Sequence, residues 1–342
     1  MKNIIITGVT GQDGAYLSQY LLSKSNDYKI YGIFRRTSLD PLQRLKILGI
    51  HKNINLLDVD LAEHNRINYY IKTIKPVMFF NLAAMSFVGY SYDNPVYTDQ
   101  VNNLGVLNIL ESIKFNSPKT KFYQASSSEM YGDVIKKNVK LNEDSKFNPI
   151  SPYAISKLSA YYYTRMYRKS YKIFASNGIL FNHEGPLRGD QFVTKKIIKG
   201  LVLYKNTGIP LSLGNIYSRR DWGNAEDYVK MMYKILLYSK PDDFVIASEQ
   251  QYSVKDFVNF ACKSLNINIK WQGKGLNEKA VNEKGKTVIL VSKKFFRPLD
   301  VVNLLGDASK ANKILGWKSK ISIHTLIKNM INHQLNNPIS LD

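Results

Sequence analysis

The chain has 342 residues and a formal net charge of +21, and 44% of its residues are hydrophobic. This length predicts one large domain with a smaller lobe, or two domains, and the lone Cys262 excludes an internal disulfide. Because the lysines are spread along the chain and no apolar run approaches the roughly 20 residues that span a bilayer, we expect a cytoplasmic protein with no nucleic-acid partner, no membrane segment and no metal site.

Short apolar runs alternate with segments of helical period through the first half of the chain. We predict buried strands at residues 3–7, 29–34, 54–58, 77–82, 121–125 and 173–179, and helices that include residues 15–23, 103–114 and 154–169. Strands that alternate with helices indicate βαβ units and a parallel sheet. The predicted fold class is therefore α/β, with a Rossmann-type doubly wound parallel sheet.

The second half of the chain is less regular. We expect loops at residues 186–189 and 208–222, and a polar, glycine-bearing segment at residues 272–286. Residues 1–180 are predicted to form the NADP-binding Rossmann domain, for the reasons given below. Residues 181–342 are predicted to form mainly a smaller α/β substrate-binding lobe, with elements around residues 220–250 returning to the sheet.

A glycine-rich turn follows the first predicted strand directly and opens a helix. Gly8, Gly11 and Gly14 have the spacing G-x-x-G-x-x-G. Glycines permit the tight turn and let backbone N–H groups approach a pyrophosphate, which the helix N-terminus also attracts. Turn glycines are common, but a strand before and a helix after favour a dinucleotide site. The further candidate cofactor contacts within this turn are Thr10, Gln12 and Asp13.

Two arginines follow the second predicted strand, where an NAD site usually has a carboxylate. Arg35 and Arg36, with Ser38, favour the 2′-phosphate of NADP, although a solvated basic pair is the alternative. Asp60 and Leu61, after the third strand, are candidate contacts for the adenine end, with a helix N-cap as the alternative.

A tyrosine and a lysine four residues apart lie on one face of a predicted helix. Tyr153 and Lys157 can therefore point into the same cleft. A phenol has a pKa near 10, and we expect the neighbouring ammonium group to lower that value, so that the tyrosine accepts a proton from a sugar hydroxyl. Two amphipathic residues on a helix are the alternative.

A hydroxyl and a carboxylate follow the strand predicted at residues 121–125. Ser127 and Glu129 lie where the carboxyl ends of parallel strands face a ligand crevice, so both are candidates for proton chemistry on a substrate. A serine-rich loop that caps the next turn is the alternative.

These motifs carry a family resemblance. The chain resembles the GDP-mannose 4,6-dehydratases, a family of extended short-chain dehydrogenases/reductases, over roughly residues 1–335. The segments that carry the resemblance are residues 8–17, 35–38, 82–88, 123–132, 152–157, 178–184, 220–223, 296–298 and 306–317. The segments 178–184 and 220–223 are much more specific than the glycine triplet.

The resemblance implies a mechanism and a site. Tyr153 would remove the O4 proton of GDP-mannose while hydride passes to NADP, and Glu129, assisted by Ser127, would drive the loss of water across C5 and C6. Hydride would then return to C6, which yields GDP-4-keto-6-deoxy-mannose. The resemblance also implies cofactor contacts at Leu82, Ala84, Ser86, Tyr97, Lys157, His183 and Arg188, and substrate contacts at Ser86, Asn182, Lys196, Arg220 and Arg297.

The chain departs from the family pattern at several positions. Ser127 stands where the family often has Thr, and Gly185 and Leu187 stand where Ser and Arg are frequent. A related GDP-sugar such as GDP-manno-heptose is therefore an alternative substrate. A 4-reductase or an epimerase is an alternative activity, although such an enzyme would not need Glu129. A non-enzymatic dinucleotide sensor would not need the Tyr/Lys pair. The family implies a homodimer or homotetramer.

Overall fold

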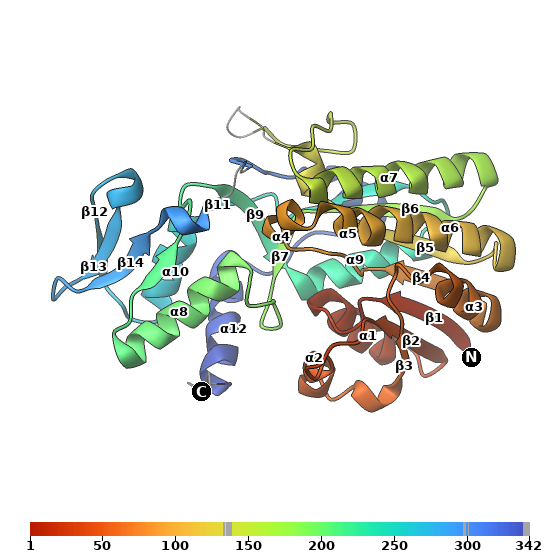
Figure 1. Ribbon diagram of the computed structural model, residues 1–342, viewed down its shortest axis with the longest axis horizontal. Coiled ribbons are helices and arrows are strands. Elements are labelled where there is room, and N and C mark those ends of the chain that lie inside the picture. The colour runs from red at the N-terminus through yellow and green to blue at the C-terminus, as the bar shows by residue number, and fades with distance from the viewer. Residues whose placement is uncertain (133, 135–138, 297–298, 300, 338–342) are drawn as a thin grey trace.

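The computed structural model describes residues 1–132, 134, 139–296, 299 and 301–337. A sheet of seven parallel strands, in the order β10–β6–β5–β4–β1–β2–β3, forms its larger part (Figure 1). The strands are β1 (Lys2–Thr7), β2 (Tyr28–Phe34), β3 (Ile54–Asp58), β4 (Met78–Asn81), β5 (Lys121–Ser127), β6 (Ala175–Leu180) and β10 (Asp243–Ile246). The predicted α/β class is confirmed.

Helices cover both faces of this sheet, because alternate strand residues point to opposite sides. Ile4 and Ile6 of β1 pack into one core with α1 (Gln12–Lys24) and α9 (Ala225–Leu237). Ile5 packs into a second core on the other face. The helices on that face are α3 (His64–Ile74), α6 (Gly105–Asn116) and α7 (Pro152–Tyr171). Strands covered on both faces explain why their sequences are almost continuously apolar.

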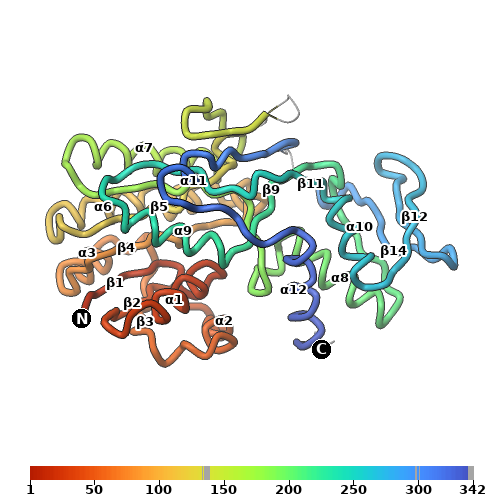
Figure 2. The backbone as a smooth tube through the Cα atoms, turned by 180° about the vertical axis from the view of Figure 1, so that it is seen from behind, coloured from red at the N-terminus to blue at the C-terminus, as the bar shows by residue number. Residues whose placement is uncertain are grey.

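Two smaller sheets and three helices gather at the other end of the molecule around a third core (Figure 2). One sheet there has the order β11–β9–β7 and another the order β12–β13–β14–β8. The strands are β7 (Asn182–Glu184), β8 (Leu211–Leu213), β9 (Arg219–Asn224), β11 (Gln251–Ser253), β12 (Ile269–Gln272), β13 (Lys279–Asn282) and β14 (Thr287–Val291). The helices are α8 (Val193–Thr207), α10 (Val254–Ser264) and α12 (Ile323–Asn336).

Short helices complete the described chain. They are α2 (Gln43–Ile47), α4 (Val88–Asp93), α5 (Pro95–Asp99) and α11 (Ser309–Leu315), with a π-helical turn at Gln100–Leu104 between α5 and α6. Single 3₁₀ turns lie at His51–Asn53, Ser128–Tyr131, Gly275–Asn277 and Lys293–Phe295.

All six predicted strands are present, but the loops of the second half were predicted too broadly. The segment 208–222 contains β8 and most of β9, and the segment 272–286 contains β13. These strands have three to six residues and depend on pairing with distant partners, as β8 does with β14. Such short runs carry too little periodicity to be recognised locally.

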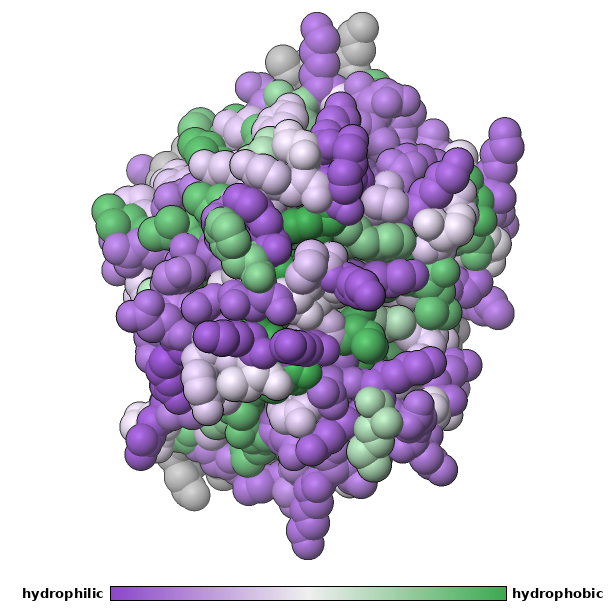
Figure 3. All heavy atoms as spheres, turned by 90° about the vertical axis from the view of Figure 1, so that its right-hand side faces the viewer, coloured by the Kyte–Doolittle hydropathy of each residue, from purple (hydrophilic) through white to green (hydrophobic). Residues whose placement is uncertain are grey.

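The face of the molecule in Figure 3 is mostly hydrophilic, as expected from charged residues that are spread along the whole sequence. On the face in Figure 3, at the large-sheet end of the molecule, hydrophilic side chains predominate and hydrophobic residues form separate areas. In the part of the chain that the structure describes, no helix is both long and apolar enough to cross a bilayer.

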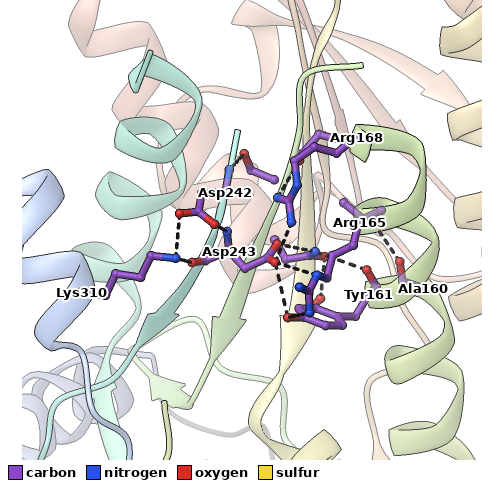
Figure 4. A network of polar contacts seen from close by, with 12 residues as sticks. Ala160, Tyr161, Arg165, Arg168, Asp242, Asp243 and Lys310 are labelled. Atoms are coloured by element: carbon purple, nitrogen blue, oxygen red, sulfur yellow. Dashed lines mark hydrogen bonds and ion pairs between the residues drawn. The ribbon is translucent and has the colours of Figure 1, made fainter. Parts of the chain in front are cut away.

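A buried carboxylate joins β10, β6 and α7 (Figure 4). Asp243 is 4% exposed, and its Oδ1 accepts a hydrogen bond of 2.8 Å from Asn177 of β6. Its Oδ2 lies 2.7 Å from Nη2 of Arg168 and 3.4 Å from Nε of Arg165, both on α7. Because α7 also carries Tyr153, this network helps to hold the candidate catalytic helix on the sheet.

Replacement of Asp243 by Asn is expected to destabilise the fold by about 3 kcal/mol, because two arginines lose a buried counter-charge. Urea unfolding followed by circular dichroism measures the change. Asp242→Asn is the matched control, since Asp242 is 41% exposed and its ion pair among the described residues is with Lys310 at 2.7 Å, so the loss of its charge is expected to cost less than about 1 kcal/mol. Equal losses for the two variants would contradict this account.

Candidate active site

The carboxyl ends of β1, β4, β5 and β6 open into a cavity of about 850 Å³. Because the strand order reverses direction between β1 and β4, this is the switch point at which open α/β sheets bind ligands. Seventeen of the predicted site residues line the cavity: Gly8, Gly11, Gln12, Asp13, Gly14, Leu82, Ala84, Ser86, Ser127, Glu129, Tyr153, Lys157, Asn182, His183, Arg188, Lys196 and Arg220. Residues that are 120 or more positions apart in the sequence therefore line the same cavity.

The glycine turn needs glycine for steric reasons. Gly8 has a φ of +67°, and a Cβ there would lie 2.8 Å from the backbone nitrogen of Ala83. A Cβ on Gly14 would lie 2.3 Å from the carbonyl oxygen of Gly8. Gly11 is the N-cap of α1 and offers no side chain to bond the first helical N–H groups. The turn therefore lets an anion approach the free N–H groups at the start of α1 closely, as binding of a dinucleotide pyrophosphate requires.

A buried threonine ties the glycine turn to the end of β4. The hydroxyl of Thr7 donates to Oδ1 of Asn81 at 2.6 Å and accepts from the backbone nitrogens of Leu82 and Ala83, each at 3.1 Å. These bonds fix the segment that presents Leu82 and Ala84 to the cavity. The sequence analysis missed Thr7 and Asn81, because only the β1–β4 pairing brings them together.

An aspartate and a histidine form a partly buried ion pair beside α1. Oδ2 of Asp13 lies 2.7 Å from Nε2 of His183, whose Nδ1 is 2.8 Å from the carbonyl oxygen of Phe181 and whose ring stacks on Tyr228. Burial by itself lowers the pKa of His183, but the charge of Asp13 and its hydrogen bond override this effect, so that the pKa is raised. Burial likewise opposes ionisation of Asp13, yet His183 holds the pKa of that carboxyl below its usual value.

The predicted contacts for the adenosine end lie outside the cavity lining. Nη1 of Arg35 donates to the Tyr97 hydroxyl at 2.8 Å, and this hydroxyl donates to Oδ2 of Asp60 at 2.6 Å. Arg36 is exposed beside them, and its backbone nitrogen donates to Asp58. The structure thus gathers Arg35, Tyr97 and Asp60 at the ends of β2 and β3.

Three further predicted contacts have less direct placements. Leu61 is 3% exposed and packs in the core under Gly105, so its side chain does not face a ligand. Ser38 is exposed beyond the end of β2. Thr10 does not line the cavity and presents its carbonyl oxygen to Nη1 of Arg44 at 3.2 Å.

Tyr153 and Lys157 both lie at the start of α7 and line the cavity. Nζ of Lys157 donates to the carbonyl oxygen of Ala125 at 2.9 Å and lies 5.9 Å from the centre of the Tyr153 ring. Burial lowers the pKa of Lys157 to about 8. Burial also raises the pKa of Tyr153 to about 12, although Ser127 and Arg188 oppose the shift. The expected lowering of the tyrosine pKa is therefore wrong for the protein without ligands, because desolvation of the phenolate outweighs the hydrogen bond with Ser127 and the charge of Arg188.

Ser127 ends β5 and begins the next turn, so the turn-capping interpretation holds, and its role in proton chemistry stays a prediction. Its Oγ accepts a hydrogen bond of 3.2 Å from the backbone nitrogen of Glu129, so it caps the 3₁₀ turn Ser128–Tyr131. The same hydroxyl favours the phenolate of Tyr153. Glu129 opposes that phenolate through its negative charge and lines the cavity. The three side chains therefore form one electrostatically coupled group.

The π-helical turn before α6 places a third residue that the sequence analysis missed, Asn102. Oδ1 of Asn102 accepts from the backbone nitrogen of Met85 at 2.8 Å, and its Nδ2 donates to Ser156 at 3.2 Å. Ser156 donates to the carbonyl oxygen of Tyr153 at 2.8 Å. Asn102 therefore joins the cavity segment near Ser86 to the first turn of α7. A π-turn often marks a functional site, but no local sequence signal reveals it.

The predicted substrate contacts come from the second half of the chain. Oδ1 of Asn182 is buried at the cavity and has no hydrogen-bond partner among the described residues, and Nζ of Lys196 lies 3.3 Å from the centre of the Phe295 ring. Arg220 is 7% exposed and lines the same cavity, and Arg188 pairs with Glu184 at 2.9 Å. The predicted contact Arg297 lies outside the described residues.

Comparison with known proteins settles the family. The family described as GDP-mannose 4,6 dehydratase matches residues 5–330. The chain belongs to this family. It is 42% identical to the GDP-mannose 4,6-dehydratase of Vibrio cholerae serotype O1 over 96% of this chain and 92% of that protein. It is 41% identical to GDP-mannose 4,6 dehydratase 2 of Caenorhabditis elegans over 96% of this chain and 88% of that protein.

Solved structures of this fold resemble the family member described here at low identity. A dTDP-glucose 4,6-dehydratase from Bacillus anthracis, in complex with NAD, has a TM-score of 0.82 at 20% identity over 98% of this chain and 97% of that chain. RMD from Pseudomonas aeruginosa, in complex with NADPH, has a TM-score of 0.78 at 19% identity over 99% and 100% of the chains. At such identities the likeness supports the doubly wound α/β fold.

In this GDP-mannose 4,6-dehydratase family member, the Asp13–His183 pair is expected to make folding stability depend on pH. The folded state holds the His183 proton more tightly than the unfolded state, so the pair contributes fully below the ordinary histidine pKa of 6.5 and loses its contribution as the pH rises through the raised pKa. It also loses its contribution at low pH, as the pH falls through the lowered pKa of Asp13.

The test compares the wild type with His183→Gln by urea unfolding at about pH 5.5 and about pH 9. The wild type is expected to exceed the variant in stability by more at the lower pH. Loss of the Tyr228 ring contact affects both conditions alike, so the difference between them isolates the ion pair. An advantage that is independent of pH would contradict the pairing.

Proposed function

We propose that the protein converts GDP-mannose to GDP-4-keto-6-deoxy-mannose and water, with NADP as an internal hydride carrier. The observation that carries the proposal is that one cavity holds two acid/base pairs, Tyr153 with Lys157 and Ser127 with Glu129. A simple oxidation or reduction at C4 needs only the first pair. Family membership over residues 5–330 supports the same reaction.

Tyr153 is the proposed base for the O4 proton. Its pKa of about 12 in the free protein means that the phenol holds its proton at neutral pH. Lys157, with a pKa of about 8, is mostly cationic there. Since a cation favours the phenolate and Ser127 lowers the pKa of Tyr153, we infer that Lys157 and the Ser127 hydroxyl stabilise the phenolate in the complex.

Glu129 and Ser127 are proposed to carry the elimination. The ketone at C4 acidifies the C5 proton, which the Glu129 carboxylate accepts. The C6 hydroxyl leaves as water with the proton that Tyr153 took from O4, relayed through Ser127. The Glu129 carboxyl returns its proton to C5 after C6 is reduced. A positioned acid or base of this kind contributes about 10²- to 10⁴-fold to the rate.

The cavity residues fit a dinucleotide. A Cβ on Gly8 or Gly14 would clash with the backbone of the turn or its neighbour. Within the described part of the chain, no side chain caps the first N–H groups of α1, and the buried Oε1 of Gln12 has no partner. When bound, NADP supplies reversible hydride transfer between C4 and C6 of the sugar. We assign NADP because Arg35 and Arg36, rather than a carboxylate, follow β2.

The sugar nucleotide is proposed to bind from the side formed by residues 181–342. Asn182, Lys196 and Arg220 come from this part of the chain and line the cavity. Arg and Lys side chains suit a diphosphate, and the unpartnered Oδ1 of Asn182 suits a sugar hydroxyl or a base N–H.

The decisive test is conversion of GDP-mannose by the purified protein with catalytic NADP⁺, followed by mass spectrometry. Wild-type protein is expected to release the 4-keto-6-deoxy product. Glu129→Gln keeps the size and polarity of the side chain but removes the base, so we expect turnover to fall by about 10²-fold or more while NADP⁺ affinity stays nearly unchanged.

Tyr153→Phe is expected to stop the same reaction at its first step, because it removes the phenolic hydroxyl group and leaves the aromatic ring in place. Full turnover by Glu129→Gln would exclude the proposed role of that carboxylate. Product from GDP-manno-heptose but none from GDP-mannose would replace the proposed substrate.

Cofactor preference is tested by titration. Wild-type protein is expected to bind NADP⁺ more tightly than NAD⁺, and replacement of Arg35 and Arg36 by Gln is expected to weaken NADP⁺ by about tenfold or more with little effect on NAD⁺. An unchanged ratio of the two affinities would exclude these arginines as the 2′-phosphate contact.

A further inference from the structure

Arg44 reaches from α2 to the glycine turn. Its Nε donates to the carbonyl oxygen of Leu187 at 2.7 Å, and its Nη1 donates to the carbonyl oxygen of Thr10 at 3.2 Å. The side chain is half-buried and lines the cavity. Thr10 directly precedes Gly11, the N-cap of α1, so the guanidinium lies at the edge of the turn that faces a phosphate.

Arg44 is a cation without a counter-charge. Among the described residues, no carboxylate lies within ion-pair distance of it, whereas Arg188 nearby pairs with Glu184 at 2.9 Å. Asp190, whose charge favours the protonated form of Arg44, pairs with Lys199 at 2.6 Å instead. Burial lowers the pKa of Arg44, and the charge of Arg188 adds to this effect. A partly desolvated guanidinium of this kind is costly unless an anion compensates it.

The remaining donors of Arg44 are suited to a phosphate. A guanidinium has five N–H groups, and the two carbonyl oxygens use two of them. The other three are available in the planar fork that matches phosphate oxygens. Since Leu187 and Thr10 hold the group from both sides, it is also positioned in advance.

We propose that Arg44 binds the pyrophosphate of the dinucleotide and supplies the counter-charge at the N-terminus of α1. This assignment rests on the proposed function, because it assumes a dinucleotide in the cavity. The pyrophosphate is favoured over the 2′-phosphate because Arg44 contacts the residue before Gly11, whereas Arg35 and Arg36 follow β2. Arg44 thereby also couples the loop around Leu187 to cofactor binding.

The test is Arg44→Met, with dissociation constants for NADP⁺ and NAD⁺ measured by calorimetric titration. Because both dinucleotides contain the pyrophosphate, we expect both constants to rise by a similar factor of about 10- to 100-fold. The variant is also expected to lose part of the salt dependence of binding, since one cation–phosphate contact is gone. Arg44→Lys, which keeps the charge but not the fork, is expected to lie between wild type and Arg44→Met.

Lys46→Met is the matched control. Lys46 is on the same helix, is half exposed and pairs with Asp40, so its loss removes one positive charge without touching the cavity. Its constants are expected to stay within about twofold of wild type. Melting curves without ligand show whether each variant is folded at the titration temperature, and Arg44→Lys serves if Arg44→Met is not.

Three results would overturn the proposal. Unchanged constants in folded Arg44→Met would exclude the contact, and weakening of NADP⁺ alone would move Arg44 to the 2′-phosphate. Equal weakening in Lys46→Met would show a general charge effect. Each of these leaves the wild-type dehydration assay unaffected, so failure of this inference is distinguishable from failure of the proposed function.

Discussion

Parallel strands end at a common edge of their sheet, and the site depends on this constraint. β1, β4, β5 and β6 run in the same direction, so the glycine turn, the segment from Leu82, and Ser127 all begin at that edge. The crossover helices on the two faces then start or finish nearby, which brings Tyr153 to the same space. Right-handed crossovers leave an opening where the strand order reverses, beside β1.

Desolvation shifts the pKa values of Tyr153 and Lys157, the proposed redox pair, in opposite directions. It lowers the pKa of Lys157 to about 8 and raises the pKa of Tyr153 to about 12, so in the free protein the lysine is cationic at neutral pH and the tyrosine is neutral. The tyrosine becomes a base only when nearby groups stabilise its anion. Ser127 does so directly, and its hydroxyl therefore links the proposed O4 base, Tyr153, to the residues proposed for the dehydration, Ser127 and Glu129.

Most of the charged side chains around the glycine turn have an opposite charge beside them, and Arg44 is the exception among those described. Asp13 and His183 compensate each other, as do Arg188 and Glu184. Among the described residues, the hydrogen-bond acceptors of Arg44 are carbonyl oxygens, and the open N-terminus of α1 adds a positive partial charge beside it. This part of the cavity is therefore electropositive where a pyrophosphate is proposed to bind, whereas the carboxyl group of Glu129 lies at the proposed sugar end.

Local patterns predicted most of the first half of the chain. The six predicted strands form, and the helix that carries Tyr153 extends from Pro152 to Tyr171. The short strands β8 and β9 were not predicted, since their stability comes from pairing with distant segments. Thr7, Asn102 and Arg44 were missed for a related reason, because each acts through contacts with residues that are remote in sequence.

The sequence by itself determined the features that depend on near neighbours: a glycine turn between a strand and a helix, and a phenol and an ammonium group one helical turn apart. These follow from backbone sterics and helix geometry, which act within a few residues. Tertiary structure alone decided that Asp13 meets His183, that Ser127 touches the phenol, and that burial raises the tyrosine pKa. Those outcomes depend on which distant segments exclude water from the same cavity, and spacing along the chain contains no record of that.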